Sequence, residues 1–221
     1  MRWLLHITMF FLVFALTVPA TASDVLDRIV ATVNGTAILE SDWDEAVRFE
    51  CLLEQKPLAS LSPADLKATL ERLIDQTLIQ QQMQSARYVV LSPEETSRRV
   101  QEIHQQAARN FLAQTPALTW QQALSEYGLT ESEFEERAAM QVQSLRFIDV
   151  RFRPSIRIDQ RSVETYYREK LLPELQRNGG KATPLAEVSP KIEELLVQQR
   201  VDEMLTAWLR DLRAQSEVEV R

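Results

Sequence analysis

Most of the chain from residue 63 onward has apolar positions that recur with the period of an α-helix. Four apolar stripes show this spacing, and each would lie along one face of a helix. They comprise Leu66, Leu70, Leu73, Ile74 and Leu78; Val100, Ile103, Ala107 and Phe111; Phe134, Ala138, Val142, Leu145, Ile148 and Phe152; and Ile192, Val201, Leu205, Trp208 and Leu212. We expect these stripes to be buried, because one-sided apolar faces normally pack against a core.

Capping sequences mark the start of three of these helices. Residues 62–65 (Ser-Pro-Ala-Asp) and 92–95 (Ser-Pro-Glu-Glu) each place a capping hydroxyl before a proline at the first helical position, with an acidic residue close behind. Residues 130–133 (Thr-Glu-Ser-Glu) form a capping box without proline. These signals predict helices that begin directly after Ser62, Ser92 and Thr130.

The stretch behind the third helix is less regular. Pro154 is expected to end that helix, and residues 155–159 look extended. Residues 163–176 are predicted to be helical, and Pro173 would kink or end this segment.

A linker at residues 178–184 separates this region from the last helix. Ser189 is followed by Pro190, a pair typical of a helix start. We therefore predict that the last helix begins there rather than at Leu185.

The start of the chain behind its apolar N-terminus has a different pattern. Ile29–Val33 is rich in β-branched residues, and Thr36–Leu39 is a second apolar run. Asn34-Gly35 between them is a strong hairpin signal, because a type I′ turn needs positive φ at two successive residues. The pattern predicts a β-hairpin.

This hairpin needs a partner, since an isolated two-stranded hairpin is marginal in water. Ser41 or Asp42 is expected to cap a following helix that carries Trp43 and Val47. Val218–Val220 alternates as an edge strand does, and we expect it to return to the hairpin.

These elements together predict a mainly α fold. It would be a helical lobe with a small N-terminal β-hairpin that a short C-terminal strand joins. The chain has only four glycines, so few turns can adopt positive φ, which argues against an all-β fold.

The N-terminal residues have the pattern of an export signal. Arg2 gives a positive start, Ile7–Val18 is an almost unbroken apolar run, and Ala20-Thr21-Ala22 fits a cleavage site. The apolar run is too short to span a bilayer comfortably. We predict that residues 1–22 are a cleaved signal peptide; the alternative is a retained signal anchor.

Charge and composition narrow the chemistry of the exported part. The net charge of −7 does not favour a phosphate-binding surface. Behind the signal remain one histidine, His104, and one cysteine, Cys51, too few for a Cys/His zinc site. Cys51 is expected to be buried as a small apolar residue, and His104 to be a partly exposed helix residue. We predict no catalytic residue, no metal and no cofactor.

Apolar and aromatic side chains are then the recognition chemistry that remains. The segment 109–128 holds Phe111, Leu112, Trp120 and Tyr127, and these four are the candidate substrate-binding residues. The alternative is an ordinary helix–loop–helix in which the same side chains point inward.

Three stretches of the sequence resemble known proteins. Residues 28–42 (RIVATVNG, then ILESD) are similar to the opening strands and helix start of SurA-like periplasmic chaperones. Residues 70–79 (LERLIDQTLI) resemble the next helix of that family, and residues 200–213 with Val218–Val220 resemble its final helix and closing strand. The order of these stretches is more specific than any one of them.

The resemblance also contains a departure. Family members usually carry one or two parvulin-type prolyl isomerase domains between the N-terminal helices and the last helix. In this chain that place holds only the short linker 178–184. Behind the signal peptide (1–22), the resemblance therefore implies an N-terminal hairpin and helical chaperone region (23–153), a connecting segment where relatives carry the isomerase (154–188), and a C-terminal helix and strand that pack back on the N-terminal region (189–221).

The function that the resemblance implies is an ATP-independent periplasmic chaperone. It would bind unfolded exported or outer-membrane polypeptides through apolar contacts, without cofactor, nucleic acid or stable membrane insertion. A separate isomerase or the assembly machinery would be further partners. Two alternatives stay open: a divergent peptidyl-prolyl cis-trans isomerase, and a structural subunit of an envelope assembly complex.

Overall fold

The protein is described by a computed structural model, which covers residues 27–85, 91–177, 179 and 183–221. The predicted signal peptide and most of the predicted 178–184 linker lie outside these residues. The elements are β1 (Ile29–Val33), β2 (Thr36–Leu39), α1 (Glu40–Glu54), α2 (Pro63–Ser85), α3 (Pro93–Gln114), α4 (Trp120–Glu126), α5 (Glu131–Phe152), α6 (Gln160–Tyr166), a π-helical segment (Tyr167–Leu171), α7 (Leu172–Arg177), α8 (Leu185–Ala214) and β3 (Val218–Val220). The predicted mainly α fold with a small sheet is confirmed.

The sheet joins the two ends of the described chain. β1 is its central strand and pairs antiparallel with both β2 and β3, in the order β2-β1-β3. Asn34 (φ +50°) and Gly35 (φ +81°) connect β1 to β2, as the predicted hairpin turn requires. The predicted return of Val218–Val220 to the hairpin is confirmed, because Val33 pairs with Val218 and Ala31 with Val220.

Asn34 links three parts of the chain at this turn. Its side-chain amide donates to Gln81 Oε1 on α2 (2.8 Å) and to Ser216 Oγ (3.3 Å), and its Oδ1 accepts from the Glu217 N–H (2.9 Å). Its own N–H donates to the Glu217 carbonyl at 2.8 Å. One residue in a left-handed conformation thus holds the hairpin, α2 and the start of β3 together.

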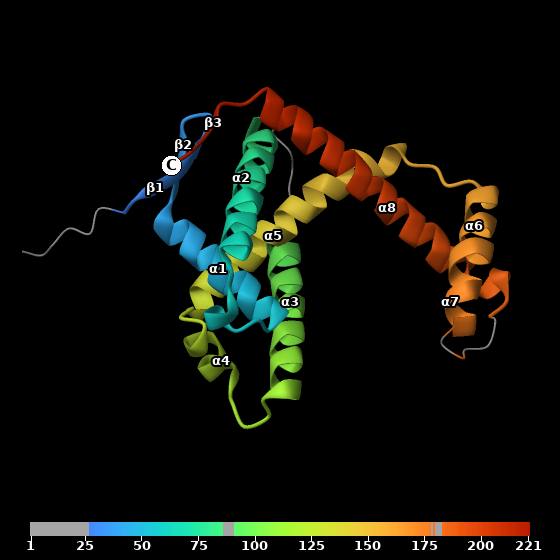
Figure 1. The fold of residues 1–221 in the computed structure, drawn as a ribbon, viewed down its shortest axis with the longest axis horizontal. Coiled ribbons are helices and arrows are strands. Elements are labelled where there is room, and N and C mark those ends of the chain that lie inside the picture. Colours follow the sequence, from blue (N-terminus) through green and yellow to red (C-terminus); the bar gives the residue numbers. More distant parts are fainter. Residues whose placement is uncertain (1–26, 86–90, 178, 180–182) are drawn as a thin grey trace, which may run out of the picture.

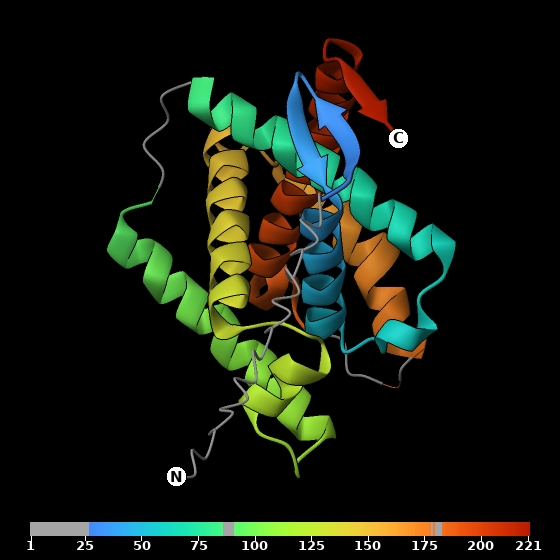
Figure 2. The ribbon, with the colours of Figure 1, turned by 90° about the vertical axis from the view of Figure 1, so that its left-hand side faces the viewer.

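The helices form a body with a projecting arm. α1, α2 and α5 pack on one another below the sheet, and α3 and α4 lie at the end of the body away from the sheet (Figures 1 and 2). α8 starts beside α6 and α7 in the arm, crosses α5, and ends beside the sheet (Figure 1). α8 is therefore the element that connects the arm to the body.

Three clusters of buried side chains stabilise this arrangement. One lies under the sheet, one among α1, α3, α4 and α5, and one between α5 and α8. Among their members are Val33, Ile38, Ile74 and Leu78; Phe49, Leu52, Phe111, Trp120 and Phe134; and Phe147, Ile148, Phe152 and Val201. The predicted stripes supply about half of these residues. Contrary to the prediction of full burial, Leu145 of the third stripe is 57% exposed, and five stripe residues are only half-buried: Leu66, Ile103, Leu205, Trp208 and Leu212.

Two predicted helix starts are wrong. Neither Ser41 nor Asp42 caps α1, which begins at Glu40; Asp42 lies inside the first turn and accepts the Leu39 N–H at 3.0 Å. The last helix begins at Leu185, and Pro190 lies inside it. A proline there removes the bond to the Ala186 carbonyl alone, and Ala186 and Pro190 are both exposed, so solvent can satisfy that carbonyl.

The other helix predictions hold. Ser62, Ser92 and Thr130 accept from the N–H groups of Asp65, Glu95 and Glu133 at the starts of α2, α3 and α5. The helical segment before residue 177 is interrupted just ahead of Pro173, where the π-helical turn ends at Leu171.

Replacement of Asn34 tests how strongly this residue holds the N-terminal hairpin and the C-terminal strand together. We expect Asn34→Ala to lower the free energy of unfolding by about 2 kcal/mol, because alanine is strained at positive φ and the side-chain hydrogen bonds are lost. Asn34→Gly, which relieves the strain but also lacks the bonds, should lose about half as much. Urea unfolding followed by circular dichroism measures both, and equal losses would contradict the role of the backbone conformation.

Candidate functional site

A hollow of about 570 Å³ opens on the body between α1, α2 and α5, with one residue from α8. We call it the main groove. Its apolar lining is Phe49, Leu53, Ile79, Leu145 and Leu209. Its polar lining is Glu50, Glu54, Arg72, Asp75, Gln76, Arg137, Gln141 and Ser144. Eight of these thirteen residues are polar, yet most of the surface that they expose in the groove is apolar, as expected of a binding site.

Arg137 fixes α5 against α1 at the base of the main groove. Its side chain is 8% exposed and donates from Nε to Glu45 Oε1 at 2.6 Å and from Nη2 to the Asp42 carbonyl at 2.6 Å. A buried guanidinium with both partners in place is strongly positioned, since loss of either partner would leave a desolvated charge. The positive charge of Arg137 is therefore neutralised by a partner within the protein.

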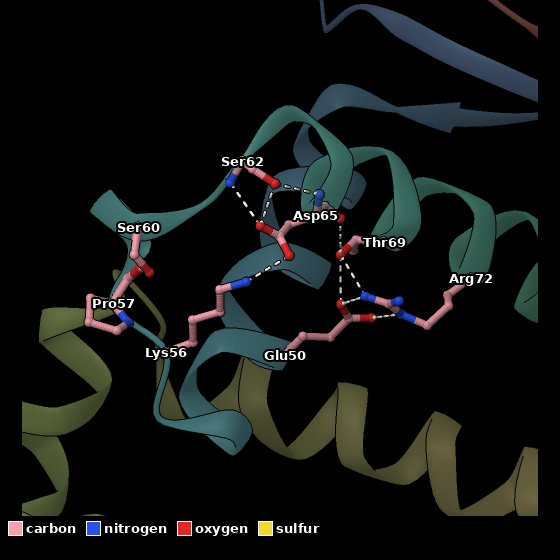
Figure 3. Close-up of polar contacts among 8 residues, drawn as sticks. All are labelled: Glu50, Lys56, Pro57, Ser60, Ser62, Asp65, Thr69 and Arg72. Atoms are coloured by element: carbon pink, nitrogen blue, oxygen red, sulfur yellow. Dashed lines mark hydrogen bonds and ion pairs between the residues drawn. The ribbon is translucent and has the colours of Figure 1, made fainter.

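A polar network joins α1 and the residues directly behind it to α2 (Figure 3), and its members Glu50 and Arg72 line the main groove. Arg72 donates from Nε to Glu50 Oε1 at 2.8 Å, and Thr69 donates to Glu50 Oε2 at 2.6 Å. At the start of α2, Lys56 Nζ lies 2.7 Å from Asp65 Oδ1 while Ser62 donates its N–H and its hydroxyl to Asp65 Oδ2. The connection between α1 and α2 is thus held by paired charges.

Leu145 forms one edge of the main groove and is also the wall of a second hollow. This side hollow has a volume of about 460 Å³, lies between α3 and α5, and is lined by Leu91, Ile103, Val142, Leu145 and the charged residues Glu95, Arg99, Glu102, Arg146 and Asp149. At 57% exposure, Leu145 is a large apolar side chain in water between two concavities. Together with the apolar lining of both hollows, it extends a contiguous apolar surface of the kind that marks a contact site.

Ser144 lines the main groove directly beside Leu145. The residue is 8% exposed, and its Oγ has no hydrogen-bond partner among the described residues. A buried hydroxyl without a partner carries a desolvation cost, commonly about 1–3 kcal/mol. The wall of the groove therefore contains an unused donor and acceptor.

The four substrate-binding candidates from the sequence lie elsewhere. Phe111, Trp120 and Tyr127 are buried in the cluster among α1, α3, α4 and α5, and Leu112 packs against that cluster with partial exposure. They do come together, but they do so as part of the hydrophobic core. Phe111 and Tyr127, for example, pack edge to face with their ring centroids 6.4 Å apart. This is the inward arrangement that the sequence analysis left open, and contact with a bound chain through these residues stays a prediction that requires the lobe to open.

The two residues with the strongest intrinsic chemistry are in structural positions. Cys51 is buried, and burial raises the pKa of its thiol, so that the reactive thiolate is disfavoured. The His104 ring stacks on Trp120 with centroids 4.9 Å apart, and its Nδ1 lies 3.6 Å from Glu131 Oε1. The expected burial of Cys51 and partial exposure of His104 are both confirmed.

The fold and the main groove define a helical binding lobe closed by a small sheet. The family model for the SurA-like N-terminal domain matches residues 1–146, more than half of the chain, and the chain belongs to this family. Membership suggests a chaperone-like role and implies binding of unfolded client proteins in general. The same comparison finds no prolyl isomerase domain.

Two further findings bear on the class of protein. A comparison with curated proteins gives no match. Among the described helices, none combines the length and the apolar character that crossing a bilayer requires.

The sequence did not reveal the main groove because its residues come from four helices that are far apart in the chain. Phe49, Ile79, Leu145 and Leu209 meet only after α8 has returned across the body. The sequence contained one indication of the groove. Leu145 belongs to the third apolar stripe, and the other residues of that stripe are enough to form the buried face of the helix without it. Periodicity identifies such a stripe but cannot tell which of its members remain uncovered.

The acidic residue at the start of α2, Asp65, makes the connection between α1 and α2 sensitive to acid. The Lys56 ammonium, together with hydrogen bonds from Ser62, holds the pKa of Asp65 well below its usual range. Because the pKa in the folded state is depressed, this stabilisation is complete above the unfolded pKa of about 4 and is lost as the pH falls below it.

We therefore expect Asp65→Asn to be less stable than wild type by a constant amount from neutral pH down to about pH 4.5, with the difference shrinking at lower pH. Chemical unfolding at a series of pH values measures this. A difference that stays constant to about pH 2 would contradict the assignment.

Phe111 offers a test of the sequence-predicted site. Since the side chain is 5% exposed, Phe111→Leu should lower the free energy of unfolding by about 1–2 kcal/mol. Suppression of client aggregation should be unchanged at temperatures where the variant is folded. If a folded Phe111→Leu variant no longer suppressed aggregation, the result would instead support the sequence prediction that Phe111 contacts the client.

Proposed function

We propose that the protein is an ATP-independent periplasmic chaperone that holds unfolded exported polypeptides, outer-membrane proteins among them, in the main groove. The observation that carries this proposal is the exposed Leu145 at the edge of a groove with apolar walls, on a SurA-like N-terminal domain. An exposed leucine that joins apolar lining on both sides is part of a contiguous apolar surface, and burial of such a surface by a partner is favourable.

The energetics support holding rather than tight capture. Full burial of one aliphatic or aromatic side chain gives roughly 1.5–3 kcal/mol, and a groove of this size admits few of them. The client also pays for the ordering of its backbone and side chains. Binding is then weak and reversible, which suits a chaperone that must release its client without ATP.

The charges of the groove support the same mechanism. Arg72 and Arg137 are each paired within the protein, with Glu50 and Glu45. These two arginines are therefore not free to form strong ion pairs with a client. Apolar contact remains the general means of recognition. The chain's net charge of −7 would keep the occupied chaperone soluble.

The remaining parts of the proposal concern location and partners. Cleavage after Ala22 would release the chain, from residue 23 on, into the periplasm. Residues 154–188, which include α6, the π-helical segment and α7, would occupy the place where relatives carry an isomerase domain, and 189–221 would complete the chaperone lobe. A separate isomerase or the outer-membrane assembly machinery would act on the same clients.

The test is suppression of aggregation of a denatured β-barrel protein by the chain from residue 23 on, without nucleotide. We expect Leu145→Asp to reduce suppression about fivefold or more and to leave the unfolding transition unchanged, because the side chain is largely exposed. Leu195→Asp is the matched control, since Leu195 is an exposed leucine (39%) on α8 that does not line the groove.

Two outcomes would contradict the proposal. Equal loss of suppression in both variants would mean that the groove has no special role. Absence of suppression by wild type, together with acceleration of proline isomerisation in a peptide substrate, would favour an enzyme instead.

A further inference from the structure

We propose that the main groove and the side hollow form one two-part site, and that an extended client segment with a cationic residue crosses α5 over Leu145 with one apolar side chain in each hollow. This inference rests on the proposed function and specifies the kind of segment that the site selects. The occupant is a stretch of unfolded polypeptide rather than a lipid chain or a second copy of the protein.

The first argument is geometric. Leu145 is the residue that lines both hollows, and it is the most exposed leucine among the described residues. A segment bound in either hollow reaches Leu145, and covering this side chain from both sides buries more apolar surface than either contact alone. The two hollows are therefore adjacent halves of a continuous surface on α5.

The second argument is polar. Ser144, beside Leu145, is 8% exposed and its Oγ lacks a partner among the described residues. A serine hydroxyl changes direction by rotation about χ1 and can then donate to or accept from a main-chain amide. An extended polypeptide supplies such amides at every residue, whereas an acyl chain supplies none. The free hydroxyl thus favours a peptide as the occupant.

The third argument is the balance of charge. The main groove is lined by three carboxylates and two guanidinium groups, and the side hollow likewise by three carboxylates and two guanidinium groups. The guanidinium groups have acidic partners: Arg72 and Arg137 bond Glu50 and Glu45, while Arg99 and Arg146 pair with Glu102 and Asp149.

The charge that is left over is negative and lies in the main groove, because Asp75 pairs with Arg213 and, in the side hollow, Glu95 pairs with Arg98. Glu54 lines the main groove and makes no hydrogen bond or ion pair among the described residues, although its charge acts on nearby Lys56 and Arg72. A lysine or arginine next to the apolar anchors of a client segment would complement this charge, and an acidic residue would be repelled.

The experiment uses labelled peptides of twelve residues in a Ser/Thr/Gly host, with fluorescence anisotropy as the readout. One peptide carries two leucines and a flanking lysine, and two further peptides each lack one leucine; the spacing of the leucines is varied over two, four and six residues. We expect the best two-leucine peptide to bind wild type about tenfold tighter than either single-leucine peptide, because the second anchor binds intramolecularly.

Two blocking variants separate the hollows. Gln141→Trp fills the main groove from an exposed position on α5, and Glu102→Trp fills the side hollow from an exposed position on α3. Each should reduce the advantage of the two-leucine peptide to about twofold or less. Gln198→Trp, at an exposed position of α8 that lines neither hollow, is the control and should leave the advantage unchanged.

A second pair of variants tests the hydroxyl. Ser144→Ala should weaken binding of the two-leucine peptide about threefold without loss of stability. Thr96→Val is its control, because Thr96 Oγ1 on α3 is a buried hydroxyl that also lacks a partner among the described residues but lines neither hollow. Replacing the peptide's lysine with glutamate should weaken binding about threefold at low salt, and the difference should vanish at high salt.

The outcomes distinguish this inference from the proposed function. Aggregation suppression without any advantage for two leucines, or an advantage that Glu102→Trp leaves intact, overturns the two-part site and leaves the chaperone function standing. Absence of both peptide binding and suppression overturns the two together. Loss of the advantage in both blocking variants, with the control unaffected, supports the site as described.

Discussion

The pairing of β1 with strands from both ends of the chain is the constraint on which the other features depend. β1 lies between β2, which follows it directly, and β3, which ends at Val220. Asn34 ties this sheet to α2, and Arg213 at the end of α8 donates to Asp75 at 2.6 Å and to Glu71 at 2.5 Å on the same helix. Since β3 must reach β1, the end of α8 is brought onto α2.

The position of α8 in turn decides what is covered and what stays open. α8 buries one side of α5 through Val201 and Trp208, the latter 6.1 Å from Phe147 between ring centroids. It contributes Leu209 to the main groove but does not reach Leu145. A helix held at both of its ends therefore leaves part of a neighbouring apolar face exposed, and that uncovered part is what a client would cover.

Local chemistry explains which predictions succeeded. The hairpin turn could be predicted because Asn-Gly is one of the few residue pairs in which both residues readily adopt positive φ, as Asn34 and Gly35 do. The starts of α2, α3 and α5 could be predicted because the capping hydroxyl accepts a hydrogen bond from an N–H only three residues further along the chain. The start of α8 was not, because a proline near a helix N-terminus loses one hydrogen bond, a cost that the packing of a long helix outweighs.

The sequence by itself determined the helical class, the hairpin, the return of the last strand, and the family resemblance that the family comparison confirms. It also identified Phe111, Trp120 and Tyr127 as important apolar residues, yet only the tertiary structure decided that they belong to the core and that Leu145 does not. The reason is that periodicity specifies the face of a helix on which a residue lies. Whether that face is covered depends on helices that arrive from distant parts of the chain.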